Sequence, residues 1–338
     1  MENGKVQFII PNLNKGLYEF KVNYSGDNNY LSYQTNSSVK VEQTPILHVD
    51  NLTIYYGSNF TVRLENDLIS NQTIAITLAN RTYNVMTDNN GVASIAINMT
   101  PGNYDVEVEY RLNNTVMANL TANLTVLPTI VENKDLIKYY RNDSQYSVKV
   151  LDKKGNPASD AKVRFYIIGK VYEIICDKNG IASLPINLNP GNYSIVVEYD
   201  GLNVSNNITV LSTIIGKNLV KYYKNDSQYS VKILDENGKP VTNKNVTFNI
   251  IGKFYTVSCD ENGLCTLPIN LLPGNYIVTA IYNGLMHSNN ITVLSTLEGE
   301  NLVKYYRNSS QLKVKALCKF VTFNFYGKFY NISTDENG

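Results

Sequence analysis

The sequence predicts an all-β protein built from tandem sandwich repeats of about 83 residues, and three observations support this prediction. The motif Lys-Tyr-Tyr begins at Lys138, Lys221 and Lys304, which are 83 residues apart. Apolar and polar residues alternate with a period of two in most segments. Asn-Gly and Pro-Gly turns separate these segments. Self-similarity at a fixed period indicates an array of like units.

The composition favours no strongly charged partner. Lys and Arg number 30 against 29 Asp and Glu, which leaves a formal net charge of +1 and does not favour nucleic acid or an anionic membrane. Polarity comes instead from Asn, Ser and Thr, with 26 Tyr and no Trp. No apolar run reaches the roughly 18 to 20 residues of a membrane span, and Met1–Lys5 does not begin a signal peptide. An export signal and an anchor are therefore expected outside this chain.

Each repeat contains the same elements in the same order. A Tyr-Tyr element is followed by an alternating strand, a Gly-Pro turn, another strand, an Asp-x-Asn-Gly turn and a Pro-Gly-Asn-Tyr corner. A more divergent copy begins near Pro45. This order predicts a partial repeat at 1–44, complete repeats at 45–128, 129–212 and 213–295, and a partial repeat at 296–338, with separate sandwiches joined by very short linkers.

The alternation assigns one face of each strand to a core. Tyr229, Val231 and Ile233 form the inward set of one strand, and the acidic residues between the apolar positions of 104–110 must face water because buried carboxylates are costly. A period of two excludes helix for these segments. Roughly seven short strands in each repeat predict an immunoglobulin-like Greek-key β-sandwich.

A tyrosine follows each Pro-Gly-Asn corner directly before the longest alternating strand. This is the place of a tyrosine corner in sandwich folds, where a buried hydroxyl bonds back to the backbone upstream. An ordinary core tyrosine without a special partner is the alternative. The corner residues predicted are Tyr18, Tyr104, Tyr193 and Tyr276.

These motifs together resemble a known family. The runs Lys-Tyr-Tyr-(Arg/Lys)-Asn-Asp-Ser-Gln-Tyr, Asp-x-Asn-Gly, Pro-Gly-Asn-Tyr and Asn-x-Ile-Thr-Val resemble the bacterial-type Ig-like repeats of archaeal adhesin-like surface proteins, over essentially the whole chain. Asn23–Tyr30 resembles the end of another Ig-like repeat of those proteins. The resemblance implies attachment to a cell surface or a stalk function, and it supplies no catalytic or ligand residues.

The four cysteines do not form a disulfide scaffold, so each needs its own interpretation. Cys176 stands where other copies carry Thr and is best read as a small strand residue. Cys259 and Cys265 flank the turn 260–263, where a cross-hairpin disulfide could form or both thiols could stay reduced. Cys318 has no evident partner.

No constellation of catalytic residues is found, so the chain is not expected to be an enzyme and no cofactor or metal is expected. Two histidines, His48 and His287, occupy non-equivalent positions, which argues against hydrolase triads and His-rich metal sites. The Asp-x-Asn-Gly turns lack the further carboxylates of a calcium site. A lysine–asparagine isopeptide link needs a nearby buried acid, and none recurs in register, so Lys138 and its equivalents are expected to be exposed edge-strand lysines.

Asn-x-Ser/Thr sequons number about nineteen, where composition predicts roughly six or seven. The excess fits a glycosylated, exported stalk, and Asn-Thr alternation on solvated strand faces is the alternative. The sites that recur between repeats are Asn142, Asn225, Asn308, Asn207 and Asn290.

The expected function is that of a non-enzymatic, extracellular, adhesin-like stalk, whose rigid spacers hold a distal adhesive tip or themselves contact a ligand on a cell wall, host or partner cell. The alternative is a glycan-binding repeat module using exposed tyrosines. Because Tyr139 and Tyr140 are adjacent, as are Tyr222 and Tyr223, one ring of each pair is expected to face outward.

The two ends carry complementary parts of a repeat. Met1–Gly4 aligns with the turn 260–263, and the same turn recurs at Asp335–Gly338. The first stretch then holds only the last strands of a sandwich, and the final stretch only the first strands, with eight residues of the Gly-Pro connection missing. We expect a piece of a longer gene product whose half-repeats associate head to tail, because each exposes an apolar face and an unpaired edge.

Overall fold

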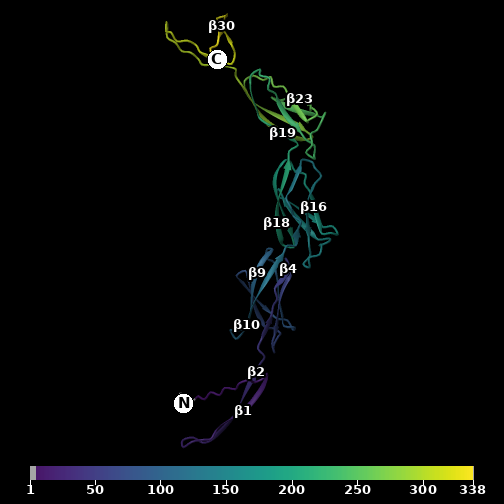
Figure 1. Cartoon of the computed structure of the whole chain (residues 1–338), viewed down its shortest axis with the longest axis vertical. Helices are drawn as coiled ribbons and strands as arrows, with labels where there is room; N and C mark the ends of the chain where they lie inside the picture. Colours follow the sequence, from purple (N-terminus) through teal and green to yellow (C-terminus); the bar gives the residue numbers. More distant parts are fainter. Residues whose placement is uncertain (1–4, 338) are drawn as a thin grey trace. The chain divides into compact units, whose positions relative to one another are not determined.

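Residues 5–337 are described by the computed structural model. All regular secondary structure assigned within them is β-strand (Figure 1). The predicted turns at 1–4 and at Gly338 lie outside the described residues. No helix that is long and apolar enough to cross a membrane occurs in the described part.

The repeat 213–295 shows the architecture most clearly. One sheet has three antiparallel strands in the order β19 (Ile214–Gly216), β21 (Tyr229–Ile233), β24 (Leu264–Leu267). The second sheet has five strands, and its first strand runs parallel to the second while the others are antiparallel. Its order is β20 (Leu219–Tyr222), β26 (Leu285–Leu294), β25 (Gly274–Tyr282), β22 (Asn245–Ile250), β23 (Lys253–Ser258).

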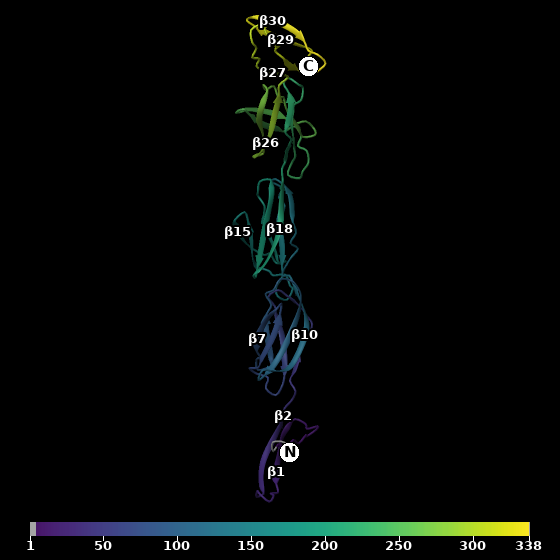
Figure 2. The same ribbon diagram turned by 90° about the vertical axis from the view of Figure 1, so that its left-hand side faces the viewer.

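The two preceding repeats have the same pair of sheets, which confirms the predicted all-β fold of tandem Ig-like sandwiches (Figure 2). In 45–128 the orders are β3 (Ile46–His48), β5 (Asn59–Glu65), β8 (Val92–Ala96) and β4 (Leu52–Tyr55), β10 (Thr115–Leu127), β9 (Gly102–Leu112), β6 (Thr73–Leu78), β7 (Arg81–Met86). In 129–212 they are β11 (Ile130–Val131), β13 (Gln145–Val150), β16 (Ile181–Pro185) and β12 (Leu136–Tyr139), β18 (Leu202–Leu211), β17 (Gly191–Tyr199), β14 (Lys162–Ile167), β15 (Lys170–Ile175).

The core lies between the two sheets of each repeat, where the alternation places it. In 213–295 the inward residues of β21 and of β22 are between 0 and 4% exposed and belong to one apolar cluster. Tyr229 meets Phe248 edge to face, with ring centroids 5.9 Å apart. Burying these alternate positions on both sheets stabilises the sandwich, because apolar surface leaves water while the intervening polar residues stay solvated.

The contacts divide the chain into two compact units. The first comprises residues up to 134 together with 147–184 and 196–205, and the second comprises 135–146, 185–195 and the residues from 206 onward. The contacts described below lie within one unit or the other. The repeat boundaries remain predictions.

The two ends hold open sheets of two strands. The first is the hairpin of β1 (Gly16–Tyr24) and β2 (Tyr33–Val41). The last described stretch has β27 (Leu297–Gly299) paired with β28 (Val314–Ala316), and β29 (Phe320–Phe325) paired with β30 (Lys328–Ser333).

Candidate functional site

In the first unit, the Tyr-Tyr element of one repeat lies against a turn of the next. The ring of Tyr55 lies so close to Gly155 that a Cβ at this glycine would collide with it. Ser58 Oγ donates a hydrogen bond to the carbonyl oxygen of Lys153 at 2.8 Å. A side chain at Gly201 would approach the hydroxyl of Tyr56 to 3.2 Å. The tyrosine pair therefore forms part of a junction between repeats.

The second unit repeats this junction one period later. Tyr139 covers Gly238 as Tyr55 covers Gly155. Arg141 Nη1 donates to Asn283 Oδ1 at 3.0 Å, and Asn142 Nδ2 donates to the carbonyl of Glu236 at 2.9 Å. Tyr139 and Tyr140 are both half-buried. The expectation that one ring faces outward is therefore wrong for this pair, because the next repeat supplies a surface that the sequence of one repeat does not reveal, whereas in the pair Tyr222 and Tyr223 one ring is exposed.

The turn under each tyrosine is held by an aspartate. Asp152 Oδ1 accepts hydrogen bonds from the backbone amides of Asn156 and Lys154, each at 2.8 Å, and Asp235 does the same in the next repeat. Donation from the Asn156 amide holds the pKa of Asp152 below its usual value. Gly155 has φ of +85°, a conformation that favours glycine, and its bare backbone leaves room for the ring.

The third tyrosine pair has no such turn to cover. The stretch after β28 lacks the eight residues that carry the Gly-Pro turn in the preceding repeat. Tyr222 is accordingly 44% exposed. In the last copy of the motif, Tyr305 and Tyr306 are 82% and 88% exposed. The exposure of Tyr222 thus goes with the absence of the glycine turn, while Tyr223 stays half-buried.

The lysine of the Lys-Tyr-Tyr motif is buried, which corrects the expectation of an exposed edge-strand side chain. Lys138 is 4% exposed, and its Nζ donates to the carbonyls of Ser144 and Ile186, each at 2.9 Å. Burial lowers the pKa of Lys138. Lys221 is likewise 5% exposed. The strands are edge strands, as expected, but the side chains point inward and satisfy backbone carbonyls there.

Each predicted corner tyrosine donates to the carbonyl oxygen four residues upstream. Tyr193 bonds to Asn189 at 2.7 Å and Tyr276 to Leu272 at 2.8 Å. Tyr18 and Tyr104 make the same contact, with Asn14 at 2.9 Å and Thr100 at 2.5 Å. These rings are half-buried rather than buried, because they cover the corner from outside the core.

A second set of tyrosines, of which the sequence analysis assigned Tyr229 to the core alone, makes polar contacts through buried rings. Tyr146 and Tyr229 are each 1% exposed, and their hydroxyls donate to Asn206 Oδ1 and Asn289 Oδ1 at 2.7 Å. Burial raises the pKa of both tyrosines to about 12. The signal that could have found these pairs is the Asn-Asn doublet, which recurs at the period of the repeat.

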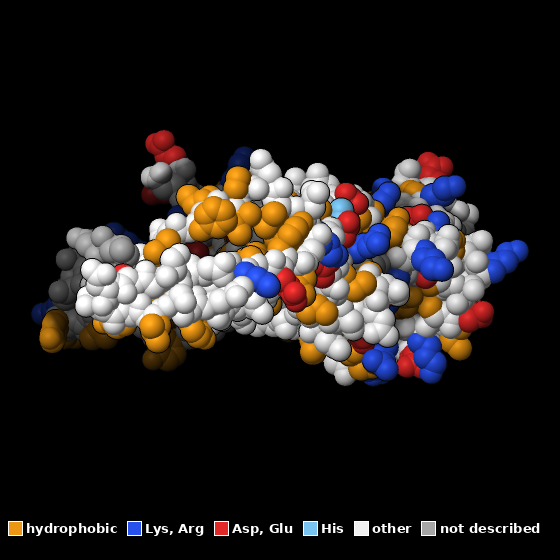
Figure 3. All heavy atoms as spheres, turned by 90° about the horizontal axis from the view of Figure 1, so that it is seen from below, with side chains coloured by type: hydrophobic (Ala, Val, Ile, Leu, Met, Phe, Trp, Pro, Cys, Tyr) orange, Lys and Arg blue, Asp and Glu red, His pale blue; other side chains and the backbone are white. Residues whose placement is uncertain are grey.

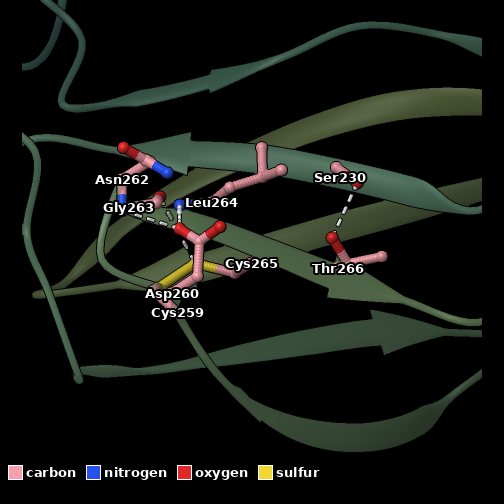
Figure 4. Close-up of a disulfide and its surroundings, with 8 residues drawn as sticks. All are labelled: Ser230, Cys259, Asp260, Asn262, Gly263, Leu264, Cys265 and Thr266. Atoms are coloured by element: carbon pink, nitrogen blue, oxygen red, sulfur yellow. Dashed lines mark hydrogen bonds between the residues drawn. A yellow bond between two sulfur atoms is a disulfide. The ribbon is translucent and has the colours of Figure 1, made fainter.

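The structure joins Cys259 and Cys265 by a disulfide across the turn 260–263, with a Cα separation of 4.2 Å (Figure 4). Asp260 Oδ1 accepts hydrogen bonds from the backbone amides of Asn262 and Leu264 within this turn. Cys176 is buried, and burial raises the pKa of its thiol to about 11. Cys318 is exposed and free.

The recurrent sequons differ in their accessibility. Asn142 is half-buried, and its amide nitrogen is engaged at the junction. The other four recurrent sequon asparagines are exposed: Asn207, Asn225, Asn290 and Asn308. Within the described part, no group of three or more His, Cys, Asp or Glu side chains could hold a metal ion.

An aromatic residue also recurs on the outer edge strand of the five-stranded sheet. Tyr83 on β7 is 39% exposed and lines a groove of about 500 Å³, together with Arg81, Asn98 and Met99. Tyr172 on β15 and Tyr255 on β23 take the same place, because each pairs with an inward residue of the neighbouring strand, as Tyr83 pairs with Ile76. Tyr330 pairs with Phe323 in the same way in the two-stranded sheet of β29 and β30.

No known protein-family model and no curated protein matches this chain. It is similar to several solved structures. The I9–I11 tandem of titin is 12% identical, over 74% of this chain and 100% of that chain, with a TM-score of 0.29. The Escherichia coli adhesin FdeC is 16% identical, over 75% and 98%, with a TM-score of 0.20. A Bacteroides ovatus glucan-utilization protein, SGBP-B, solved with a mixed-linkage heptasaccharide, is 11% identical, over 76% and 72%, with a TM-score of 0.23. Because the identities and TM-scores are this low, these similarities support no statement about the function of this chain.

Proposed function

We propose that this chain is a non-enzymatic, adhesin-like stalk of a cell surface, in which Ig-like sandwiches serve as spacers that present or contribute to adhesion. The observation that carries the proposal is the junction found twice in register, with Tyr55 over Gly155 and Tyr139 over Gly238. A spacer must resist bending between its units, and a ring packed on bare backbone limits such motion.

The linkers between repeats support the same function. Thr129 and Thr213, which begin the repeats 129–212 and 213–295, are 2% and 5% exposed, and their carbonyls accept hydrogen bonds from the amides of Leu151 and Leu234 of the same repeats at 2.8 Å. The end of each linker is thus fixed to the sandwich that it enters and has little of the freedom of a flexible connection. The disulfide and the exposed sequons favour an oxidising, extracellular setting for these spacers.

Small-angle X-ray scattering tests the spacer function. We expect Gly155→Ala with Gly238→Ala to broaden the distribution of maximum dimensions, because each new methyl displaces the ring that covers it. Gly169→Ala with Gly252→Ala is the matched control, since these glycines have similar φ values, +70° and +71°, and nothing within 4 Å. A wild-type chain that already scatters as freely jointed units would contradict the proposal.

The groove beside Tyr83 supports a second function, the binding of a glycan. An exposed aromatic ring with an arginine and an asparagine beside it offers stacking and hydrogen bonds to a sugar. We expect binding in a glycan array to be lost in Tyr83→Ala. Met86→Ala, at a 61% exposed residue of the same strand that does not line the groove, should bind normally. Equal binding by both variants would place any glycan elsewhere.

A further inference from the structure

The groove beside Tyr83 is lined by two small side chains. Ala79 stands in the turn between β6 and β7, and Ala96 ends β8. A larger side chain at either position takes up part of the groove, which measures about 500 Å³. The other two complete repeats carry isoleucine and proline at these positions, which are Ile168 and Pro185 in 129–212 and Ile251 and Pro268 in 213–295. The space for a ligand is thus a property of the sequence of 45–128.

Three polar side chains of the groove have no partner within the described part of the chain. Arg81, Tyr83 and Asn98 line the groove, and none of the three forms a side-chain hydrogen bond or an ion pair there. On the outer face of the five-stranded sheet of 129–212, by contrast, Arg164 is paired with Glu198. The groove therefore presents donors and acceptors that a ligand can use without first breaking contacts within the protein.

Ala96 also adds a backbone donor to the rim of the groove. The amide of Ile97 donates to the carbonyl of Ser58, and the carbonyl of Ile97 accepts from Gly57. Because alternate residues of an antiparallel strand face its partner, the amide of Ala96 points away from β5. β8 is the edge strand of its sheet among the described residues, so this amide is open to a ligand. The proline of the other repeats has no N–H at this position.

The charge of the groove favours an anionic ligand. Arg81 alone is charged among the described residues that line it. A guanidinium binds a carboxylate through two parallel hydrogen bonds, which strengthen where apolar side chains reduce the access of water. Asp105 and Glu107 on β9 face solvent on the outer side of the five-stranded sheet, because Val106 between them is buried in the core. The groove is lined instead from the edge strands β7 and β8.

The ring of Tyr83 supplies a flat apolar surface. It is 39% exposed, and the side chains of Ile95 and Met99 line the same groove. The C–H face of a sugar packs on such a surface, while its hydroxyls bond to an amide such as that of Asn98. A uronic acid combines both requirements, since its carboxylate is attached to the sugar ring. A free phosphate would use Arg81 but leave the tyrosine ring without a partner.

We propose that the groove of 45–128 binds an acidic glycan, in which Arg81 binds the carboxylate of a uronic acid and Tyr83 packs on its sugar ring. This inference rests on the glycan-binding function proposed above and names the class of glycan. Ala79 and Ala96 determine specificity because they keep the groove open and leave one backbone amide at its rim.

The other repeats are expected not to bind this glycan. They keep the cation and the ring, as Lys170 with Tyr172 and as Lys253 with Tyr255, but they carry isoleucine and proline in place of the alanines. General attraction is also weak, because the formal net charge is +1 and Figure 3 shows basic side chains interspersed with acidic ones. Selectivity for the carboxylate therefore rests on Arg81 rather than on the charge of the whole surface.

A glycan array tests the class of ligand. The full chain is applied to oligogalacturonate, oligomannuronate and hyaluronan fragments, each printed beside its carboxyl methyl ester and beside neutral glucans. We expect the acids to bind at least about tenfold more tightly than their esters, because the ester keeps the ring but loses the charge. Arg81→Gln should remove this difference. Arg63→Gln, at an exposed arginine of β5 that does not line the groove, should keep it.

The outcomes separate this inference from the function on which it rests. Equal binding of acids and esters that is lost in Tyr83→Ala overturns the acidic class and leaves a glycan site in place. Binding of the acids that Arg81→Gln does not weaken also overturns the inference. Absence of binding to every printed glycan, acidic or neutral, contradicts both the inference and the glycan-binding function.

The two alanines are tested by giving this repeat the residues of the others. Ala79→Ile with Ala96→Pro should abolish binding of the acids. The fold should tolerate the isoleucine, since Ala79 has φ of +47° and the isoleucines at this position have +46° and +53°. Asn80→Gly is the matched control, because the other repeats carry glycine there and Asn80 does not line the groove. Circular dichroism verifies that the variants are folded, and full binding by the folded double variant overturns the proposal.

Discussion

The ammonium of Lys221 donates a hydrogen bond to the carbonyl oxygen of Ile269 at 2.9 Å, across 48 residues of sequence. Lys138 makes the same contact with Ile186, also across 48 residues. In 213–295 the lysine joins β20, which pairs with β26, to the segment that follows β24. In 129–212 it joins β12, which pairs with β18, to the segment that follows β16. A charge is kept inside the sandwich because it satisfies carbonyls that water does not reach.

We expect Lys221→Met to destabilise the repeat 213–295 by about 1 to 3 kcal/mol, because the buried carbonyl of Ile269 loses its donor while the apolar stem is kept. Hydrogen exchange of peptides from this repeat measures the change. Lys304→Met is the matched control, since this lysine holds the same place in the motif but is exposed, and it should leave exchange unchanged. Equal exchange in wild type and Lys221→Met would show that the buried charge contributes nothing.

The corner tyrosine should contribute less to stability than the buried one. Tyr276→Phe removes a hydrogen bond at a half-exposed corner, where water can replace the hydroxyl, and should cost about 0.5 to 1 kcal/mol. Tyr229→Phe leaves Asn289 Oδ1 without its donor inside the repeat and should cost about 1 to 3 kcal/mol. Urea unfolding of both variants gives the order, and a larger loss in Tyr276→Phe would reverse this assignment.

The buried hydroxyl also predicts a dependence on pH. The pKa of Tyr229 is raised to about 12 in the folded chain, against about 10 when unfolded. Its stabilisation is therefore complete below about pH 10 and is lost as pH rises through about 12, because the unfolded state gives up the proton first. We expect the stability difference between wild type and Tyr229→Phe to shrink over this window in urea titrations. A difference that stays constant to pH 11 would contradict the assignment.

The disulfide can be transferred to the preceding repeat. Cys176 and Ala182 occupy the positions of Cys259 and Cys265, and Ala182 is fully buried. We expect Ala182→Cys to link to Cys176 and to stabilise the repeat 129–212 by about 2 kcal/mol, the entropy of closing so short a loop. A mass two daltons below the reduced form and a shift in melting temperature measure this. Ala182→Ser, which cannot form the link, is the control.

Local pattern was sufficient for much of the fold. The spacing of the Lys-Tyr-Tyr motifs predicted the array, and alternation placed Tyr229, Val231 and Ile233 in the core. Both inferences succeed because a strand presents alternate residues to opposite faces, whatever it later pairs with. The hydrogen bonds of the corner tyrosines could also be predicted from local sequence, since each hydroxyl bonds to a carbonyl only four residues upstream.

Tertiary structure alone decided what the repeated polar and aromatic residues do. Lys138 was expected to be an exposed edge-strand lysine, but its side chain points inward and donates a hydrogen bond to a carbonyl 48 residues away. One ring of the pair Tyr139 and Tyr140 was expected to face solvent. The ring of Tyr139 instead packs on the backbone of Gly238 in the next repeat, which has no side chain to keep it away. A residue's own strand sets the direction of its side chain, but burial also depends on the surface it meets. That surface comes from distant sequence, and periodicity within one repeat carries no information about it.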